Sequence, residues 1–396
     1  MKKLLLLIVL ILAVNILPAQ WTPQNSPTTS ILNDITFVDA NNGWAVGLEG
    51  IFHTSNGGTS WTSQSTNSGG SICFTDVNNG WTCYLSGKIY HTSNGGSTWA
   101  QQNSTISSHV EDIYFVDNNN GWAISYNGHI LNTTNGGSTW TQQSSGTTVF
   151  LRAVFFFDAN NGWAVGNSAT ILHTTNGGTT WIAQTSSLPN NASISSVYFV
   201  SATTGWIITR GGDILKTTNA GTTWVSQYSG TSKMLFKVFF HDANNGWISG
   251  QFGTFLKTVD GGDTWVALNY GNSQNLNSIH FNDLNNGWMV AHDGTILHTT
   301  NGGGAVGIEN IVEKSNIKIY PNPSNGEFNL ELHGQGNKNI VIEFYNTNGQ
   351  LIYTKDIQIL YNNCSEKLNL SEFNSGVYFI RIKGETTNYS QKIIIN

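Results

Sequence analysis

A Gly-Trp dipeptide that recurs seven times constrains the fold of this 396-residue chain more than any other feature. Its tryptophans stand at positions 44, 81, 122, 163, 206, 247 and 288, with successive spacings of 37, 41, 41, 43, 41 and 41 residues. A nearly fixed period of this length indicates a repeat protein, in which each copy forms one supersecondary unit that packs against its neighbours.

Each copy contains four short segments with strand character. In residues 34–64, "ITFVD" alternates apolar and polar residues, and "WAVG", "IFHTS" and "SWTSQ" follow as further strands. The "DANNG" and "NGG" segments between them are rich in turn-forming residues. Four antiparallel strands per copy make one blade of a β-propeller, so the seven copies predict an all-β, seven-bladed propeller.

The seventh copy lacks the second tryptophan that ends the other six, because Val306 occupies its place. The missing residue is found at the start of the chain. Trp21 precedes Phe37 by 16 residues, which is also the step from Trp99 to Phe115. We therefore predict that Trp21 lies on the outer strand of the last blade, supplied by the N-terminus. Such closure removes the free sheet edges of an open ring.

The first segment, "MKKLLLLIVLILAVNILPA", has the charged start, apolar stretch and small terminal residue of a secretory signal peptide. No later apolar run approaches the roughly 18 residues of a membrane span. We expect an exported chain with four parts: signal peptide 1–19, propeller 20–304, linker 305–316 and a second domain 317–396. The propeller segment has 14 acidic and 7 basic residues, so no basic patch for nucleic acid is expected.

Two parts of the chain resemble known families. The octets such as "TSNGGTSW" (54–61) resemble the Asp-box, or BNR repeat, of bacterial neuraminidases, and the whole repeat is similar to propellers related to photosystem II assembly factors. The "YPNPSNGEF", "NGQLIY" and "GVYFIRI" segments of residues 317–396 resemble a type IX secretion C-terminal sorting domain (type A). This resemblance implies a small antiparallel β-sandwich that the type IX secretion machinery recognises. It also implies secretion across, or anchoring on, the outer membrane of a Gram-negative cell.

Catalysis is not the leading interpretation. The sialidases that carry Asp-boxes grip their substrate with three arginines, whereas this propeller has only Arg152 and Arg210. Six of its 14 acidic residues repeat at one turn position. The non-periodic acidic residues on the face with the variable loops are Glu49, Glu111, Asp213 and Asp293. A pair among them could serve a glycoside hydrolase or lyase, which needs two carboxylates about 5–10 Å apart. No cofactor or metal is expected.

Length variation is confined to the loops that join strand 4 to strand 1 of the next blade and strand 2 to strand 3. These loops share one face, where binding residues are expected. Aligned four residues before the recurrent Phe, the residues predicted to ring the channel mouth are Asn33, Gly70, Glu111, Arg152, Ser195, Phe236 and Asn277. We predict a non-catalytic face that binds a glycan or a protein. Its candidate residues are Glu111, Arg152, Phe236, Tyr126, Arg210, Phe252, His292 and Asp293.

Cys73 and Cys83 flank one hairpin and could form a disulfide in an exported protein. The alternative interpretation is a pair of small buried side chains.

Overall fold

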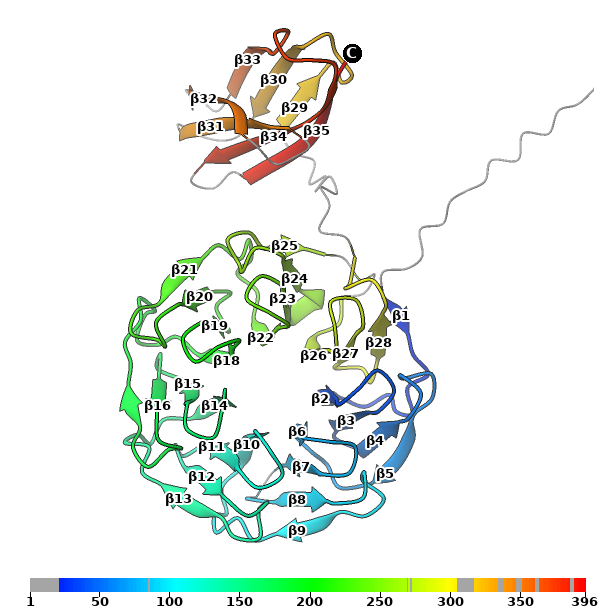
Figure 1. The fold of residues 1–396 in the computed structure, drawn as a ribbon, viewed down its shortest axis with the longest axis vertical. Helices are drawn as coiled ribbons and strands as arrows, with labels where there is room; N and C mark the ends of the chain where they lie inside the picture. The colour runs from blue at the N-terminus through cyan, green and yellow to red at the C-terminus, as the bar shows by residue number, and fades with distance from the viewer. Residues whose placement is uncertain are drawn as a thin grey trace, which may run out of the picture. The chain divides into compact units, whose positions relative to one another are not determined.

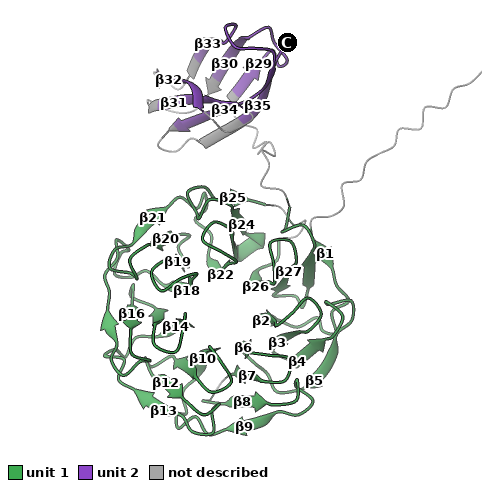
Figure 2. Ribbon diagram, viewed as in Figure 1, with its two compact units in different colours: residues 1–305 green, residues 306–396 purple. Residues whose placement is uncertain are grey.

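The computed structural model describes residues 21–84, 86–268, 270, 273–304, 317–333, 338–346, 351–359, 363–384 and 388–396. The signal peptide and the linker expected from the sequence lie outside these residues. The chain divides into two compact units, residues 1–305 and 306–396, which Figure 2 distinguishes by colour. Each unit is described by itself.

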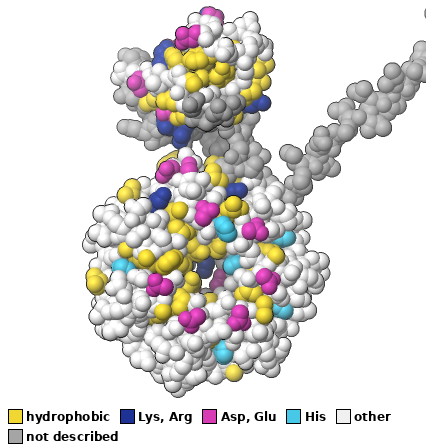
Figure 3. Space-filling model, in the orientation of Figure 1, with side chains coloured by type: hydrophobic (Ala, Val, Ile, Leu, Met, Phe, Trp, Pro, Cys, Tyr) yellow, Lys and Arg dark blue, Asp and Glu magenta, His cyan; other side chains and the backbone are white. Residues whose placement is uncertain are grey.

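The first unit is a ring of blades (Figure 1), and the space-filling view of Figure 3 shows an opening at its centre. Its described residues form seven four-stranded antiparallel sheets, which confirms the predicted all-β propeller. The first three blades are β2–β5 (Leu32–Phe37, Gly43–Gly47, Gly50–Thr54, Thr62–Ser65), β6–β9 (Ser71–Phe74, Gly80–Cys83, Ile89–Thr92, Ala100–Gln102) and β10–β13 (Val110–Phe115, Gly121–Ser125, Ile130–Thr133, Thr141–Gln143). The next three are β14–β17 (Leu151–Phe156, Gly162–Gly166, Ile171–Thr174, Ile182–Ala183), β18–β21 (Ile194–Phe199, Gly205–Thr209, Ile214–Thr217, Val225–Gln227) and β22–β25 (Leu235–Phe240, Gly246–Gly250, Phe255–Thr258, Val266–Ala267). A short 3-10 turn, η1 (Gln251–Gly253), joins β23 to β24.

The last blade contains strands from both ends of the propeller. Its inner strands are β26 (Leu276–Phe281), β27 (Gly287–Ala291) and β28 (Ile296–Thr299), and its outer strand is β1 (Thr22–Pro23). Thr22 pairs with His298. The Trp21 side chain is 3% exposed and meets Phe255 and Phe281 edge-on, with ring centroids 5.4 and 6.0 Å away. The predicted closure by the N-terminal segment is confirmed.

The Gly-Trp repeat links each blade to the next. The Phe156 ring of blade four stacks on Trp122 of blade three, with centroids 3.5 Å apart. Gly162 leaves room for that ring, because a Cβ atom there would lie 2.3 Å from Phe156. The Trp122 indole N–H in turn donates to the carbonyl of Gly177 in blade four, at 3.0 Å. The same three residue types recur in the other blades, so this packing accounts for the periodic part of the sequence.

The possible disulfide between Cys73 and Cys83 is not formed. Cys73 lies opposite Trp81, and Cys83 lies opposite Ser71. The antiparallel register therefore offsets the two cysteines by two residues, and both thiols are free. Burial raises the pKa of Cys73 to about 12. The alternative interpretation, a pair of small buried side chains, fits this hairpin.

The second unit consists of two antiparallel sheets over one core. The first sheet contains β29 (Ile317–Tyr320), β30 (Glu327–His333) and β33 (Asn363–Asn369). The second contains β31 (Lys338–Tyr345), β32 (Leu351–Ile359), β34 (Gly376–Gly384) and β35 (Asn388–Ile395). Phe328 and Leu330 of the first sheet share a buried cluster with Ile342 and Ile380 of the second. Nowhere in the described chain is there a helix of the length and apolarity that crossing a membrane requires.

Candidate functional site

The inner strands of the propeller begin with a bulge in six blades. In blade three the register of β10 against β11 shifts between Val110 and Asp112, and equivalent shifts occur in blades one, four, five, six and seven. A β-bulge inserts an extra residue and redirects the side chains beside it. Consequently two successive residues, such as Glu111 and Asp112, both line the channel.

A cavity of about 570 Å³ lies at the start of the inner strands. All seven residues aligned four positions before the recurrent Phe line it, together with Arg210 and His292 from loops between strands 2 and 3. We refer to it as the mouth cavity. Of the eight candidate residues, the five that line it are Glu111, Arg152, Arg210, Phe236 and His292. That these residues bind a ligand stays a prediction.

The remaining candidates lie outside the lining of this cavity. Tyr126 stacks on His109, with ring centroids 4.3 Å apart, and packs against Phe150 at 3.8 Å. Phe252 is 59% exposed in the η1 turn. The Asp293 carboxylate accepts a hydrogen bond from the Thr295 amide within its own turn, at 3.1 Å.

Glu111 is a residue of the mouth cavity whose ionisation is altered by burial. Its carboxylate lies 3.5 Å from His109 Nε2 and 3.9 Å from Arg152 Nη1, and the side chain is 22% exposed. Burial raises the pKa of Glu111 to about 7, although Arg152 and Arg210 oppose the rise. Glu111 therefore gains or loses its charge near neutral pH.

Both arginines of the propeller line the mouth cavity. Arg152 donates from Nε to Asn167 Oδ1 at 2.8 Å, and its guanidinium lies 4.2 Å from the centre of the Phe150 ring. The Arg210 guanidinium lies 5.8 Å from the Phe236 ring. Each guanidinium group thus lies near an aromatic face, on a surface with few other cations.

Sequence reasoning identified only Tyr126 of the aromatic wall beside these arginines. The rings of Tyr84, His109, Tyr126 and Phe150 follow one another with centroid distances of 5.9, 4.3 and 3.8 Å. His109 and Phe150 each stand two residues before a predicted mouth residue. An alignment that also compared the residues two positions earlier, in the loop, would have shown that these positions differ from blade to blade as well.

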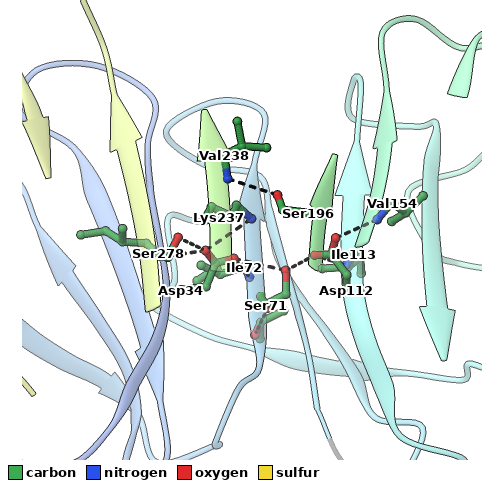
Figure 4. A network of polar contacts seen from close by, with 12 residues as sticks. Asp34, Ser71, Ile72, Asp112, Ile113, Val154, Ser196, Lys237, Val238 and Ser278 are labelled. Atoms are coloured by element: carbon green, nitrogen blue, oxygen red, sulfur yellow. Dashed lines mark hydrogen bonds and ion pairs between the residues drawn. The ribbon is translucent and has the colours of Figure 1, made fainter. Parts of the chain in front are cut away.

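Sequence reasoning also missed a polar ring one residue further along the inner strands (Figure 4). Asp34 accepts from the Ile72 amide at 3.1 Å, and Asp112 accepts from the Val154 amide at 3.0 Å. The Ser71 hydroxyl is 3.2 Å from Asp34 and 2.7 Å from Asp112. Each aspartate thus bonds to the backbone of the next blade, which indicates a role in joining blades.

Lys237 completes this ring. Its ammonium lies 3.8 Å from the Asp34 carboxylate, and its side chain remains 37% exposed to the channel. Burial alone would lower the pKa of Lys237, but Asp34 and Asp112 raise it above its usual value. Lys237 is therefore charged at neutral pH.

The acidic residues of the hydrolase alternative do not meet in the mouth cavity. Of Glu49, Glu111, Asp213 and Asp293, Glu111 alone lines it, and the other acids of the lining are Asp34 and Asp112 of the polar ring. Glu49 accepts a hydrogen bond from the Ser30 hydroxyl at 2.6 Å. Asp213 accepts one from the Thr209 hydroxyl, four residues earlier, at 2.6 Å. The described residues contain no group of three or more histidine, cysteine or acidic side chains placed to hold a metal ion.

Two family models match the chain. Residues 14–104, 97–232 and 226–309 match photosynthesis system II assembly factor YCF48, and residues 318–396 match the secretion system C-terminal sorting domain. No curated protein sequence matches the chain.

Solved structures show the same propeller fold. YCF48 bound to D1 peptide is 22% identical, with a TM-score of 0.61 over 71% of this chain and 95% of the other. YCF48 from Cyanidioschyzon merolae is 21% identical, with a TM-score of 0.60 over 71% and 98%. The WD40 propeller domain of Doa1 is 12% identical, with a TM-score of 0.59 over 70% and 96%.

Proposed function

The chain belongs to the photosynthesis system II assembly factor YCF48 family and carries a secretion sorting domain, and we propose that its propeller binds an acidic segment of a partner protein in the mouth cavity. The propeller is an exported, non-catalytic module. Residues 20–304 bind the partner, and residues 317–396 direct the protein through the type IX secretion machinery. The mature protein is then secreted, or anchored at the outer surface of the outer membrane.

One observation carries the proposal: the two arginines of an acidic propeller meet in one cavity beside an aromatic wall. Guanidinium groups recognise carboxylates through paired, charge-assisted hydrogen bonds. Aromatic faces give contact area to the apolar parts of a peptide at low cost in conformational entropy. The combination suits a peptide that has acidic side chains or a free C-terminal carboxylate.

The relative solved as YCF48 bound to D1 peptide supports a peptide rather than a glycan as the ligand class. An acidic glycan presents the same carboxylate chemistry and is the competing outcome. A glycoside hydrolase or lyase is disfavoured, because Glu111 has neither Asp213 nor Asp293 beside it in the cavity lining. The two other acids of the lining, Asp34 and Asp112, accept hydrogen bonds from the backbone of the next blade.

The test is to screen the mature chain on a peptide array and on a glycan array, and then to measure affinities for the hits. Arg152→Gln and Arg210→Gln should each weaken binding about tenfold or more, because a hydrogen bond to a charged group is worth about 1.5–3 kcal/mol. Lys88→Gln removes one charge from an exposed loop and is the matched control. Hits confined to acidic glycans, or peptide hits insensitive to both arginine variants, would refute the proposal.

A further inference from the structure

Beyond the polar ring, the next inward-facing position of each inner strand forms a collar in the channel. Its seven residues are Thr36, Cys73, Tyr114, Phe155, Tyr198, Phe239 and His280. Five consecutive blades contribute an aromatic ring, and successive centroids from Tyr114 to His280 are 5.0, 5.0, 5.2 and 5.4 Å apart. Blades one and two contribute only Thr36 and Cys73. The collar is therefore aromatic on one side and open on the other.

The collar lines a second cavity of about 230 Å³, which we refer to as the collar cavity. Asp34, Ser71, Asp112 and Lys237 line both this cavity and the mouth cavity, so the polar ring of Figure 4 lies between the two. The inner strands run from the mouth cavity towards their first turns. Figure 3 shows a face of the ring with acidic side chains around a central opening and charged side chains inside it.

Several hydrogen-bond donors of the collar cavity have no hydrogen-bond acceptor within the part of the protein that the structure describes. Three of them lie on the collar or the polar ring: the hydroxyls of Tyr114 and Tyr198, and the ammonium of Lys237, which forms an ion pair with Asp34 at 3.8 Å. Burial raises the pKa of Tyr198 to about 12 and raises that of Tyr114 as well. All three groups therefore keep their protons at neutral pH.

The charges of this cavity favour an uncharged ligand. An added anion would face Asp34 and Asp112, whereas an added cation would face Lys237. Burial lowers the pKa of His280 to about 4, so that ring stays neutral. A suitable ligand has acceptor oxygens for the three donors and an apolar face for the aromatic rings.

We propose that the collar cavity binds one uncharged sugar ring. A pyranose presents hydroxyl oxygens around its edge and C–H groups on its faces, which matches donors beside an aromatic wall. The volume of about 230 Å³ is below the roughly 300 Å³ at which sites for drug-sized ligands begin, so a single ring fits better than an oligosaccharide. This site is separate from the peptide site proposed for the mouth cavity and does not depend on it.

The experiment uses the mature chain and a panel of glucose, galactose, mannose and N-acetylglucosamine, with binding followed by saturation-transfer NMR and calorimetry. Tyr114→Phe and Tyr198→Phe remove one hydroxyl each and leave the aromatic ring in place. Each should weaken binding of the best sugar about three- to tenfold. Tyr228→Phe, at a side chain that is 70% exposed on the outside of the ring, is the control and should have no effect.

Two further measurements separate the cavities. Arg152→Gln should leave sugar affinity unchanged, and so should a change from pH 6 to pH 8, because the donors of the collar cavity do not titrate there. No saturable binding of any sugar at millimolar concentration would overturn the proposal. Full affinity in both Tyr→Phe variants would overturn it too, as would loss of sugar binding in Arg152→Gln. Preferential binding of N-acetyltyrosinamide would show that the collar accepts an aromatic side chain and not a sugar.

Discussion

Replacing Glu111 by glutamine should abolish a specific dependence of the propeller's stability on pH. The pKa of this carboxyl is raised by burial from 4.5 to about 7. Between these two values the native state holds a proton that the unfolded chain has lost, so the free energy of unfolding falls as pH rises. This pKa difference limits the loss of unfolding free energy between pH 5 and pH 8 to about 3 kcal/mol. Glutamine cannot ionise, so the variant should lack this loss.

Urea unfolding at pH 5, 6, 7 and 8, followed by tryptophan fluorescence, measures the effect. All 14 tryptophans lie between positions 21 and 288, so the signal reports the propeller and not the second unit. Subtracting the values for Glu111→Gln from those for the wild type removes the titration of the other groups. This difference should fall by about 2–3 kcal/mol from pH 5 to pH 8.

Glu49→Gln provides the control on the same face of the propeller. Hydrogen bonds from Ser30 and Thr28 hold the pKa of Glu49 below its usual value. Its difference from the wild type should therefore be flat above pH 5. A difference for Glu111→Gln that is equally flat would refute the reasoning, because it would mean that Arg152 keeps Glu111 ionised throughout. If Glu111 does take up a proton, an acidic peptide should bind more tightly at pH 6 than at pH 8.

Three predictions concern the framework. Deleting residues 20–27 removes β1 and Trp21 and should lower the melting temperature of the propeller sharply while the second unit stays folded; an unchanged fluorescence melting curve would contradict closure by the N-terminus. Gly162→Ala should cost about 1–3 kcal/mol, because its Cβ would lie 2.3 Å from the Phe156 ring, whereas Gly70→Ala, with its nearest neighbour at 3.6 Å, should cost little in the same urea assay. Asp260→Asn should change stability by less than about 0.5 kcal/mol, since six other copies of this turn have asparagine, and a larger loss would show that the carboxylate has a role of its own.

The sequence predicts those parts of the structure that repeat. Fixed spacing identifies the strands and the Phe–Trp packing, because equal copies must make equal contacts. It also shows that Trp21 supplies the tryptophan that is absent at position 306 in the last copy. Alignment also identifies the mouth residues, since the residue four positions before the recurrent Phe faces the channel in every blade. The possible disulfide shows where this reasoning stops. Spacing places Cys73 and Cys83 on one hairpin, but only the strand register decides which residues face each other.

The parts that the sequence did not predict are contacts between unequal residues of different blades. Asp34 bonds to Ile72, and Glu111 lies beside Arg152, because neighbouring inner strands converge on the axis. The bulge at the start of β10 lets both Glu111 and Asp112 face the channel, whereas simple alternation would place only one of the two there. No periodic signal marks such pairs, since each occurs once.

The framework itself explains how the channel can hold two different cavities. Blade-to-blade packing rests on the repeated Phe, Gly and Trp residues, which lie outside the channel, so the inward-facing columns are free to differ among blades. At the mouth these columns bring together Glu111, whose charge changes near neutral pH, and two arginines. At the collar they bring together donors that keep their protons. A shift of pH through 7 should therefore change binding at the mouth cavity and leave the collar cavity unaffected, although both lie on the same seven strands.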